Sequence, residues 1–161
     1  MPTVDPVDDL IATWRRELPE ALGPASELSK RIMLLGARLE RATRELLPSL
    51  GLTVAGFDIV VGIRRVGEPY RLKPNELARS LLLSTGGTSN AVNQLEAQGL
   101  VRRIADPADA RSTWIELTRE GVALAERAVL ANTAAHAEVF AGVAQEDVDA
   151  AADALRKVFT D

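Results

Sequence analysis

The chain has 161 residues, a formal net charge of −4 and 47% hydrophobic residues, of which few are aromatic. This length suits one domain, and a core of Leu, Val and Ala favours packed helices over a β-sandwich. The sequence contains no cysteine, no apolar run of about 18 residues and no signal-like start, which excludes disulfides and thiolate metal sites and predicts a cytoplasmic protein without a membrane partner.

The first half of the chain is predicted to form three helices separated by proline and glycine. Apolar residues recur at spacings of three and four in each, the period of a helix with one buried face. Ser26 and Thr53 are suited to cap the second and third helices, and Pro48 and Gly51 are expected to end the second. The predicted helices cover residues 5–17, 26–47 and 53–66, and a short strand over 70–72 follows.

The second half predicts a helix-turn-helix followed by a hairpin. A short helix over 74–81 precedes a helix over 85–98, which Gly99 can end in a left-handed conformation. Strands over 100–105 and 113–117 are expected to flank a turn of Asp and Pro residues at 106–109. Thr118 can cap a long helix, and acidic residues from Glu146 begin a last one.

This order predicts a mainly α protein with a winged helix-turn-helix, a two-stranded wing and a helical dimerisation layer. We expect one domain over residues 1–161. Its parts are an extra N-terminal helix (5–18), dimerisation helices (26–50 and 119–161) and a DNA-binding unit (53–118). The flanking helices carry more apolar surface than a small winged unit can cover, so a homodimer is expected.

The 85–98 helix has the pattern of a recognition helix in the DNA major groove. At about 100° per residue, Thr88, Ala91, Val92 and Leu95 fall on one side and are predicted to pack inward. The other side carries hydroxyls and amides, which can hydrogen-bond to base edges, while the helix start suits a phosphate. The predicted DNA contacts on this segment are Ser84, Thr85, Ser89, Asn90, Asn93 and Gln94. A solvated polar face is the alternative.

The predicted wing offers one further DNA contact. Arg111 stands where a wing-tip guanidinium can enter the minor groove, and Asp109 is close enough in sequence to orient it. The alternative is a surface ion pair of little energetic weight.

The basic residues of the chain are concentrated around this unit. Residues 64–111 hold eight Lys and Arg against five Asp and Glu, a local charge of +3, while the remainder carries −7. A basic surface on an acidic body is typical of a protein that binds DNA reversibly.

At these motifs the sequence resembles the MarR family of bacterial transcription regulators. The pattern D-x-R-x-x-x-x-x-L-T-x-x-G occupies residues 109–121, and L-E-x-x-G-L-V-x-R precedes it at 95–103. The resemblance implies a homodimer that binds double-stranded DNA at an inverted repeat. It also implies a small-molecule effector that binds between the dimer layer and the DNA-binding unit, and repression as the usual outcome.

The extra N-terminal helix resembles a subgroup of the family that includes urate-responsive regulators. Comparison with the effector site of that subgroup implies that Trp14, Asp58 and Arg103 bind the effector in this chain. Its second arginine follows Ser-Asn on the recognition helix, where this chain has Ala91, so urate is not the expected effector. Ala110 replaces a further arginine that many relatives carry in the wing.

Other functions receive less support from the sequence. Packing is the alternative role for Trp14, and a local cap or pair for Asp58. His136 is the only histidine and is expected to be a solvated helix residue, so no catalytic, metal or cofactor site is predicted and the chain is not expected to be an enzyme. The competing hypothesis is a winged protein-interaction module that has lost DNA contact, which Ala91 and Ala110 keep open.

Overall fold

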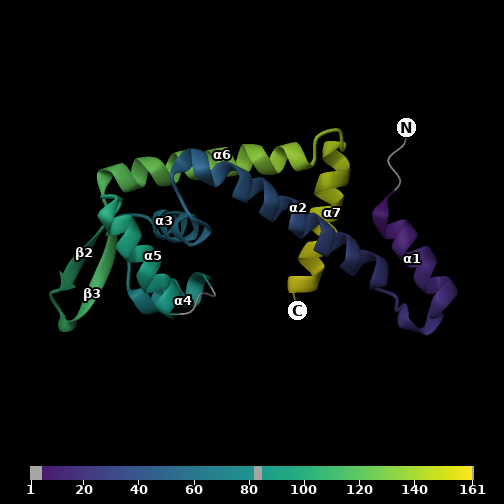
Figure 1. Cartoon of the computed structure of the whole chain (residues 1–161), viewed down its shortest axis with the longest axis horizontal. Coiled ribbons are helices and arrows are strands. Elements are labelled where there is room, and N and C mark those ends of the chain that lie inside the picture. The colour runs from purple at the N-terminus through teal and green to yellow at the C-terminus, as the bar shows by residue number, and fades with distance from the viewer. Residues whose placement is uncertain (1–4, 82–84, 161) are drawn as a thin grey trace. The chain divides into compact units, whose positions relative to one another are not determined.

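The computed structural model describes residues 5–81 and 85–160. Two compact units are present, Met1–Arg41 and Ala42–Asp161, and each is described by itself. One domain over 1–161 therefore stays a prediction. The elements along the chain are α1 (Pro6–Glu17), the 3-10 helix η1 (Pro19–Ala21), α2 (Ser26–Leu50), α3 (Val54–Arg65), β1 (Arg71–Leu72), α4 (Pro74–Leu81), α5 (Thr85–Ala97), β2 (Val101–Asp106), β3 (Asp109–Leu117), α6 (Arg119–Val139) and α7 (Gln145–Phe159) (Figure 1).

The predicted helices are confirmed, with small differences at their ends. The clearest difference is Pro48, which lies inside α2 although we expected it to end that helix. Only one main-chain hydrogen bond is lost at a proline, and α2 continues for a short distance to Leu50. Gly51, at φ +66°, ends it, and the Leu52 N–H donates to the Leu47 carbonyl over 3.2 Å.

In the first unit, ion pairs join the start of α1 to Arg31 of α2. Asp5 caps α1, because its Oδ1 accepts the Val7 N–H at 2.8 Å, and its Oδ2 lies 2.9 Å from Arg31 Nε. The Val7 N–H and the Arg31 guanidinium lower the pKa of Asp5. Val7 and Ile11 are the buried residues of α1.

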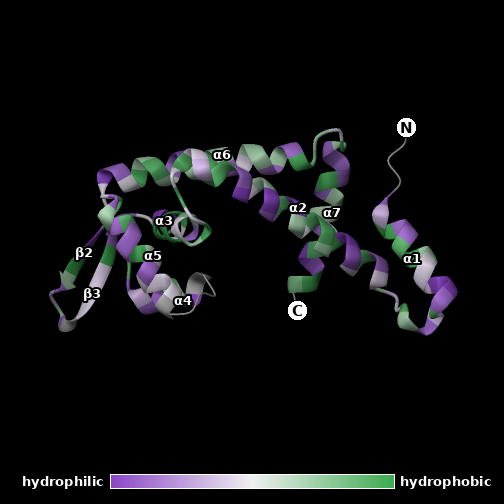
Figure 2. Ribbon diagram, viewed as in Figure 1, coloured by the Kyte–Doolittle hydropathy of each residue, from purple (hydrophilic) through white to green (hydrophobic). Residues whose placement is uncertain are grey.

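The core of the second unit is built around α3. Ile59, Val60 and Ile63 of α3 are fully buried, and the helix packs against α4, α5 and α6. Figure 2 shows the hydrophobic character of α3 beside the mixed surfaces of α5 and α6. The largest fully buried side chains of the unit are Ile59, Val60, Ile63, Leu77, Val92, Leu95, Val101 and Ile115.

The sheet has three antiparallel strands in the order β1-β3-β2. Two of them form the expected wing, and the third, β1, is the short strand expected over 70–72, which joins the wing in one sheet. Arg71 of β1 pairs with Glu116 of β3. The hairpin is also longer than expected, because β3 begins at Asp109, which pairs with Asp106. The turn is thus reduced to Pro107 and Ala108, and the hairpin extends away from the helices (Figure 1).

No single described helix has the length and apolar composition needed to cross a membrane. Within the described ranges only α2 and α3 taken together have that length and composition, and a sharp bend separates them. Such a pair is weak evidence for a membrane span.

Candidate nucleic-acid interface

The helix α5 separates its apolar and polar residues as the sequence predicts. Thr88, Ala91, Val92 and Leu95 are all buried in the described structure. The predicted contacts on the opposite face, Ser89, Asn90, Asn93 and Gln94, are all exposed. Ser84 lies outside the described residues, as does the side chain of Thr85. A phosphate contact at the start of α5 therefore stays a prediction.

Gly99 and Leu100 turn the chain from α5 into the wing. Gly99 adopts φ +72°, a conformation that favours glycine. The Gly99 N–H donates to the Glu96 carbonyl and the Leu100 N–H to the Leu95 carbonyl, each at 2.9 Å. These bonds satisfy carbonyl groups at the end of α5, and β2 then begins at Val101.

The L-T-x-x-G motif joins this turn to α6. Thr118 caps α6 by accepting the Gly121 N–H at 3.0 Å, and its hydroxyl donates to the Gly99 carbonyl at 2.7 Å. A Cβ added at Gly121 would lie 2.0 Å from the Leu100 carbonyl oxygen, so a side chain cannot fit there. The motif therefore holds the end of the recognition helix, the start of the wing and α6 together.

Arg103 connects the wing to α5. Its Nη1 pairs with Glu96, and its Nη2 donates to Asn93 Oδ1 at 2.7 Å. Asn93 is a predicted DNA contact, so one of the four exposed polar residues is engaged by the wing in this structure. The sequence did not reveal this link, which forms because the first residues of β2 lie beside α5.

Several of the basic residues counted between positions 64 and 111 are paired with acids. Arg102 pairs with Glu116, and Lys73 with Asp106 at 2.9 Å. Arg64 pairs with Glu126 at 2.8 Å. Because Glu116 and Glu126 lie beyond that stretch of sequence, the local charge of +3 overstates the positive charge of the folded surface.

The structure describes the wing tip only in part, and it differs from the prediction at Asp109. Asp109 is exposed and begins β3, whereas we expected it to belong to the turn. Arg111 lies within β3, and its side chain falls outside the described part of the structure. Their DNA and orienting roles stay predictions.

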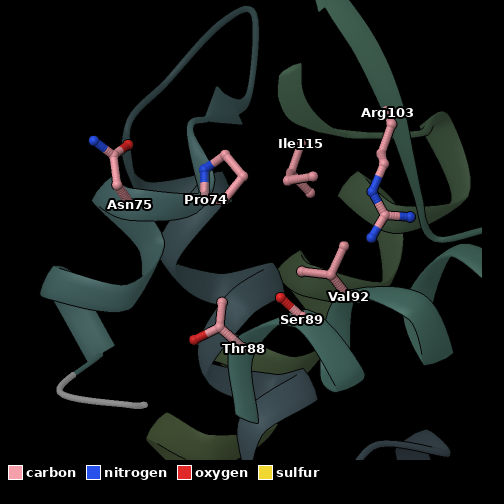
Figure 3. Close-up of a pocket in the computed structure, with 7 residues that line it drawn as sticks. All are labelled: Pro74, Asn75, Thr88, Ser89, Val92, Arg103 and Ile115. Atoms are coloured by element: carbon pink, nitrogen blue, oxygen red, sulfur yellow. The ribbon is translucent and has the colours of Figure 1, made fainter. Parts of the chain in front are cut away.

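A cavity of about 420 Å³ lies between α4, α5 and the sheet. This volume is in the range of small-molecule sites. Figure 3 shows the Arg103 side chain extending from β2 toward Val92 of α5, beside Ser89. The lining combines apolar residues (Pro74, Val92 and Ile115) with polar ones (Asn75, Thr88 and Ser89) and one cation, Arg103.

Comparisons with known proteins agree with this architecture. The MarR family model matches residues 50–112. An uncharacterized HTH-type transcriptional regulator of Bacillus cereus is 30% identical over 117 residues, covering 73% of this chain and 76% of the relative. This chain belongs to the MarR family of DNA-binding transcriptional regulators.

Two further members of the family are similar over most of the chain. The HTH-type transcriptional regulator PecS of Dickeya dadantii is 29% identical, with 76% of this chain and 74% of PecS covered. The crystal structure of wild-type MarR from E. coli in its apo form is 25% identical and has a TM-score of 0.74, with 83% of this chain and 96% of MarR covered. The winged-helix fold class predicted from the sequence is thereby confirmed.

The effector residues implied by the MarR resemblance lie on three different elements. Trp14 is on α1 in the first unit and is 41% exposed. Asp58 is half-buried on α3, and burial raises the pKa of its carboxyl group. Arg103, on β2, lines the cavity. Ala91 is an uncharged residue of the core, so this position supplies no cation that could link an effector to α5.

His136 differs from its expected role as a solvated residue. It is half-buried on α6, and its Nε2 lies 2.9 Å from Thr43 Oγ1, which also donates to Asn132 Oδ1 at 2.7 Å. The sequence could have indicated that Asn132 and His136 share a partner, because residues four positions apart lie on one face of a helix. Among the described residues no group of His, Asp and Glu side chains could hold a metal ion.

Proposed function

We propose that this MarR-family regulator binds a pseudo-palindromic operator as a homodimer, represses transcription and is released by a small anionic aromatic effector. The observation that carries the proposal is the division of α5 into a buried apolar face and an exposed face of amides and hydroxyls. A helix with this division can remain packed in its unit while its polar side reaches base edges in the major groove.

The C-terminal helices support the homodimer. Leu130 on α6 is 71% exposed, and Val158 and Phe159 on α7 are 68% and 85% exposed. No residue of α7 is buried within the described chain. Burial of such side chains against a second copy removes apolar surface from water, which favours association. Two winged units related by a two-fold axis would bind half-sites about 10 base pairs apart.

In this proposal Ser89, Asn90, Asn93 and Gln94 contact base edges, Ser84 and Thr85 contact a phosphate, and Arg111 enters the minor groove with Asp109 orienting it. DNA is then the partner in the cytoplasm, and the dimer is the binding species.

The effector part of the proposal depends on the cavity beside α5. Arg103 supplies a guanidinium for an anion, and the apolar lining suits a ring. An anion that takes the Arg103 guanidinium would compete with Glu96 and Asn93 for it. The Asn93 side chain is thereby coupled to the occupancy of the cavity. Trp14 and Asp58 stay predicted effector contacts from the MarR resemblance, and neither lines this cavity.

The DNA-binding part can be tested before the operator is known. Duplexes are selected from a random library with the purified protein, and the affinity for the enriched duplex is measured by fluorescence anisotropy across a salt series. We expect an inverted repeat, a dimer on each site, and an affinity that falls as salt rises because phosphate contacts release counterions. Selection that enriches no sequence would contradict operator binding and favour the protein-interaction module.

The effector part requires a separate titration. Benzoate carries a ring and a charge, and acetate and benzyl alcohol each carry only one of the two. We expect benzoate to weaken DNA binding more than either control, and Arg103→Gln to remove that difference. Equal effects of the three compounds would contradict an anionic aromatic site at Arg103.

A further inference from the structure

Asp106, at the end of β2, is a buried acid of the wing, with only 8% of its surface exposed. Its Oδ1 accepts the Ala108 N–H at 3.0 Å, which closes the turn of the hairpin. Its Oδ2 lies 2.9 Å from Lys73 Nζ. The Lys73 ammonium, the Ala108 N–H and the Trp114 side chain all lower the pKa of Asp106. One carboxylate therefore joins the turn to a residue outside the hairpin.

Lys73 immediately precedes the first residue of α4. Its N–H donates to Glu76 Oε2 at 2.7 Å, and its carbonyl accepts the N–H groups of Glu76 and Leu77, each at 3.0 Å. These bonds hold its backbone in place at the helix start, as in a capping box. Because α4 packs against α5, the ion pair connects the hairpin to the pair of helices that carries the recognition face.

The indole of Trp114 lies against the same residues. The Lys73 ammonium and the Arg71 guanidinium are each 4.9 Å from a ring centroid of Trp114. Cations over an aromatic face are attracted by its negative potential. Trp114 belongs to β3 and pairs with Ile104 of β2, so both strands of the hairpin are included.

We propose that Asp106 and Lys73 form a latch, with Trp114 as its packing surface, that sets the orientation of the wing relative to the recognition helix. Both are positioning residues that act on DNA through the wing. Since the latch joins a cation to an anion, it adds little net attraction for phosphate. Its contribution is the reduced freedom of the hairpin before DNA arrives, which lowers the entropy lost on binding. The inference rests on the proposed function, because it concerns the wing as a DNA contact.

The test compares variants that open the latch with one that preserves it. Asp106→Asn and Lys73→Met remove the ion pair, whereas Lys73→Arg keeps the cation and is the matched control. We expect the first two to weaken the affinity for the selected duplex about tenfold, and Lys73→Arg to stay within about threefold of the parent protein. Circular dichroism is used to verify that each variant is folded.

A spectroscopic measurement reports the latch itself. The chain has two tryptophans, so Trp14→Phe leaves Trp114 as the emitter. In that background we expect Asp106→Asn and Lys73→Met to shift Trp114 emission to longer wavelength and to increase its quenching by acrylamide. Lys73→Arg is expected to change neither. Unaltered emission in all three variants would overturn the latch.

A double-mutant cycle with Arg111→Ala distinguishes positioning from a general structural effect. If the latch acts through the wing contact, Asp106→Asn should cost little further affinity once Arg111 is removed. Fully additive losses, or an unchanged affinity in Asp106→Asn alone, would overturn the positioning role while operator binding by the parent protein stands. A parent protein that binds no selected duplex would instead overturn the proposed function, and the positioning role with it.

Discussion

The exposed face of α5 and the base of the wing are neighbours in one unit, but they differ in the chemistry of their side chains. The face of α5 offers hydroxyls and amides without a charge. The base of the wing carries Arg102 and Arg103, each paired with an acid. Uncharged amides can discriminate between bases, whereas paired cations hold elements in place and release fewer counterions from DNA. In the proposed function, α5 supplies sequence discrimination and the wing base supplies geometry.

The largest effect is expected at Gly121, on which both regions depend. Gly121→Ala places a methyl group against the Leu100 carbonyl, and we expect it to lower the free energy of unfolding by about 1–3 kcal/mol. Urea unfolding measures this change. Gly36→Ala in α2 is the control, because its Cβ would meet nothing within 4 Å, and a small stabilisation is expected there. Equal stability of the two variants would contradict the described junction.

The second prediction concerns the face of α5. Asn90→Ala and Gln94→Ala should each cost about 1–3 kcal/mol in binding to the selected duplex, because each removes an amide able to pair with a base. Anisotropy with the selected and with random duplexes measures the difference. Binding to random DNA and thermal stability should change little, since both side chains are exposed.

Gln98→Ala is the matched control for these amides. Gln98 lies just beyond α5, and its Nε2 donates to the Gly51 carbonyl at 3.3 Å. The comparison between the two regions would fail if this variant lost as much discrimination as Asn90→Ala.

A smaller effect is expected when the pairing of the wing base is reduced. Glu116→Gln leaves Arg102 without its acidic partner, so binding to random DNA should rise about threefold and depend more steeply on salt. A salt series by anisotropy measures both changes. Glu126→Gln makes the same charge change beside Arg64 on α3 and is the control. Identical effects of the two variants would show that net charge, and not the wing base, controls the affinity.

The smallest effect is expected at Asp58, which belongs to neither region. Because burial raises the pKa of its carboxyl group, the charged form is disfavoured in the folded protein. Stability should therefore increase slightly as the pH falls through that raised pKa toward the ordinary pKa of an aspartate, and Asp58→Asn should lose this increase. Thermal unfolding at several pH values measures it. Unchanged pH dependence in Asp58→Asn would assign the increase to another group.

Much of the interface could be predicted because it depends on local rules. The helical period separated Val92 and Leu95 from Asn90 and Gln94, and Thr118 indicated the cap of α6. The short strand over 70–72 was expected, but the sequence could not predict that it pairs with β3, because the pairing of a two-residue strand is decided by its partner. The prediction at Pro48 was wrong because the end of a helix depends on the hydrogen bonds of the following turn, which here involve Gly51 and Leu52.

The sequence by itself determined the order of elements, the two faces of the recognition helix and the family, because periodicity, capping residues and motif spacing are properties of neighbouring positions. Only the tertiary structure decided which charges meet. Asp106 and Lys73 are 33 positions apart, and Arg64 and Glu126 are 62 apart. Ion pairs between distant positions form only after the core has brought their elements together. Which acid pairs with each basic residue could therefore be known only from the tertiary structure.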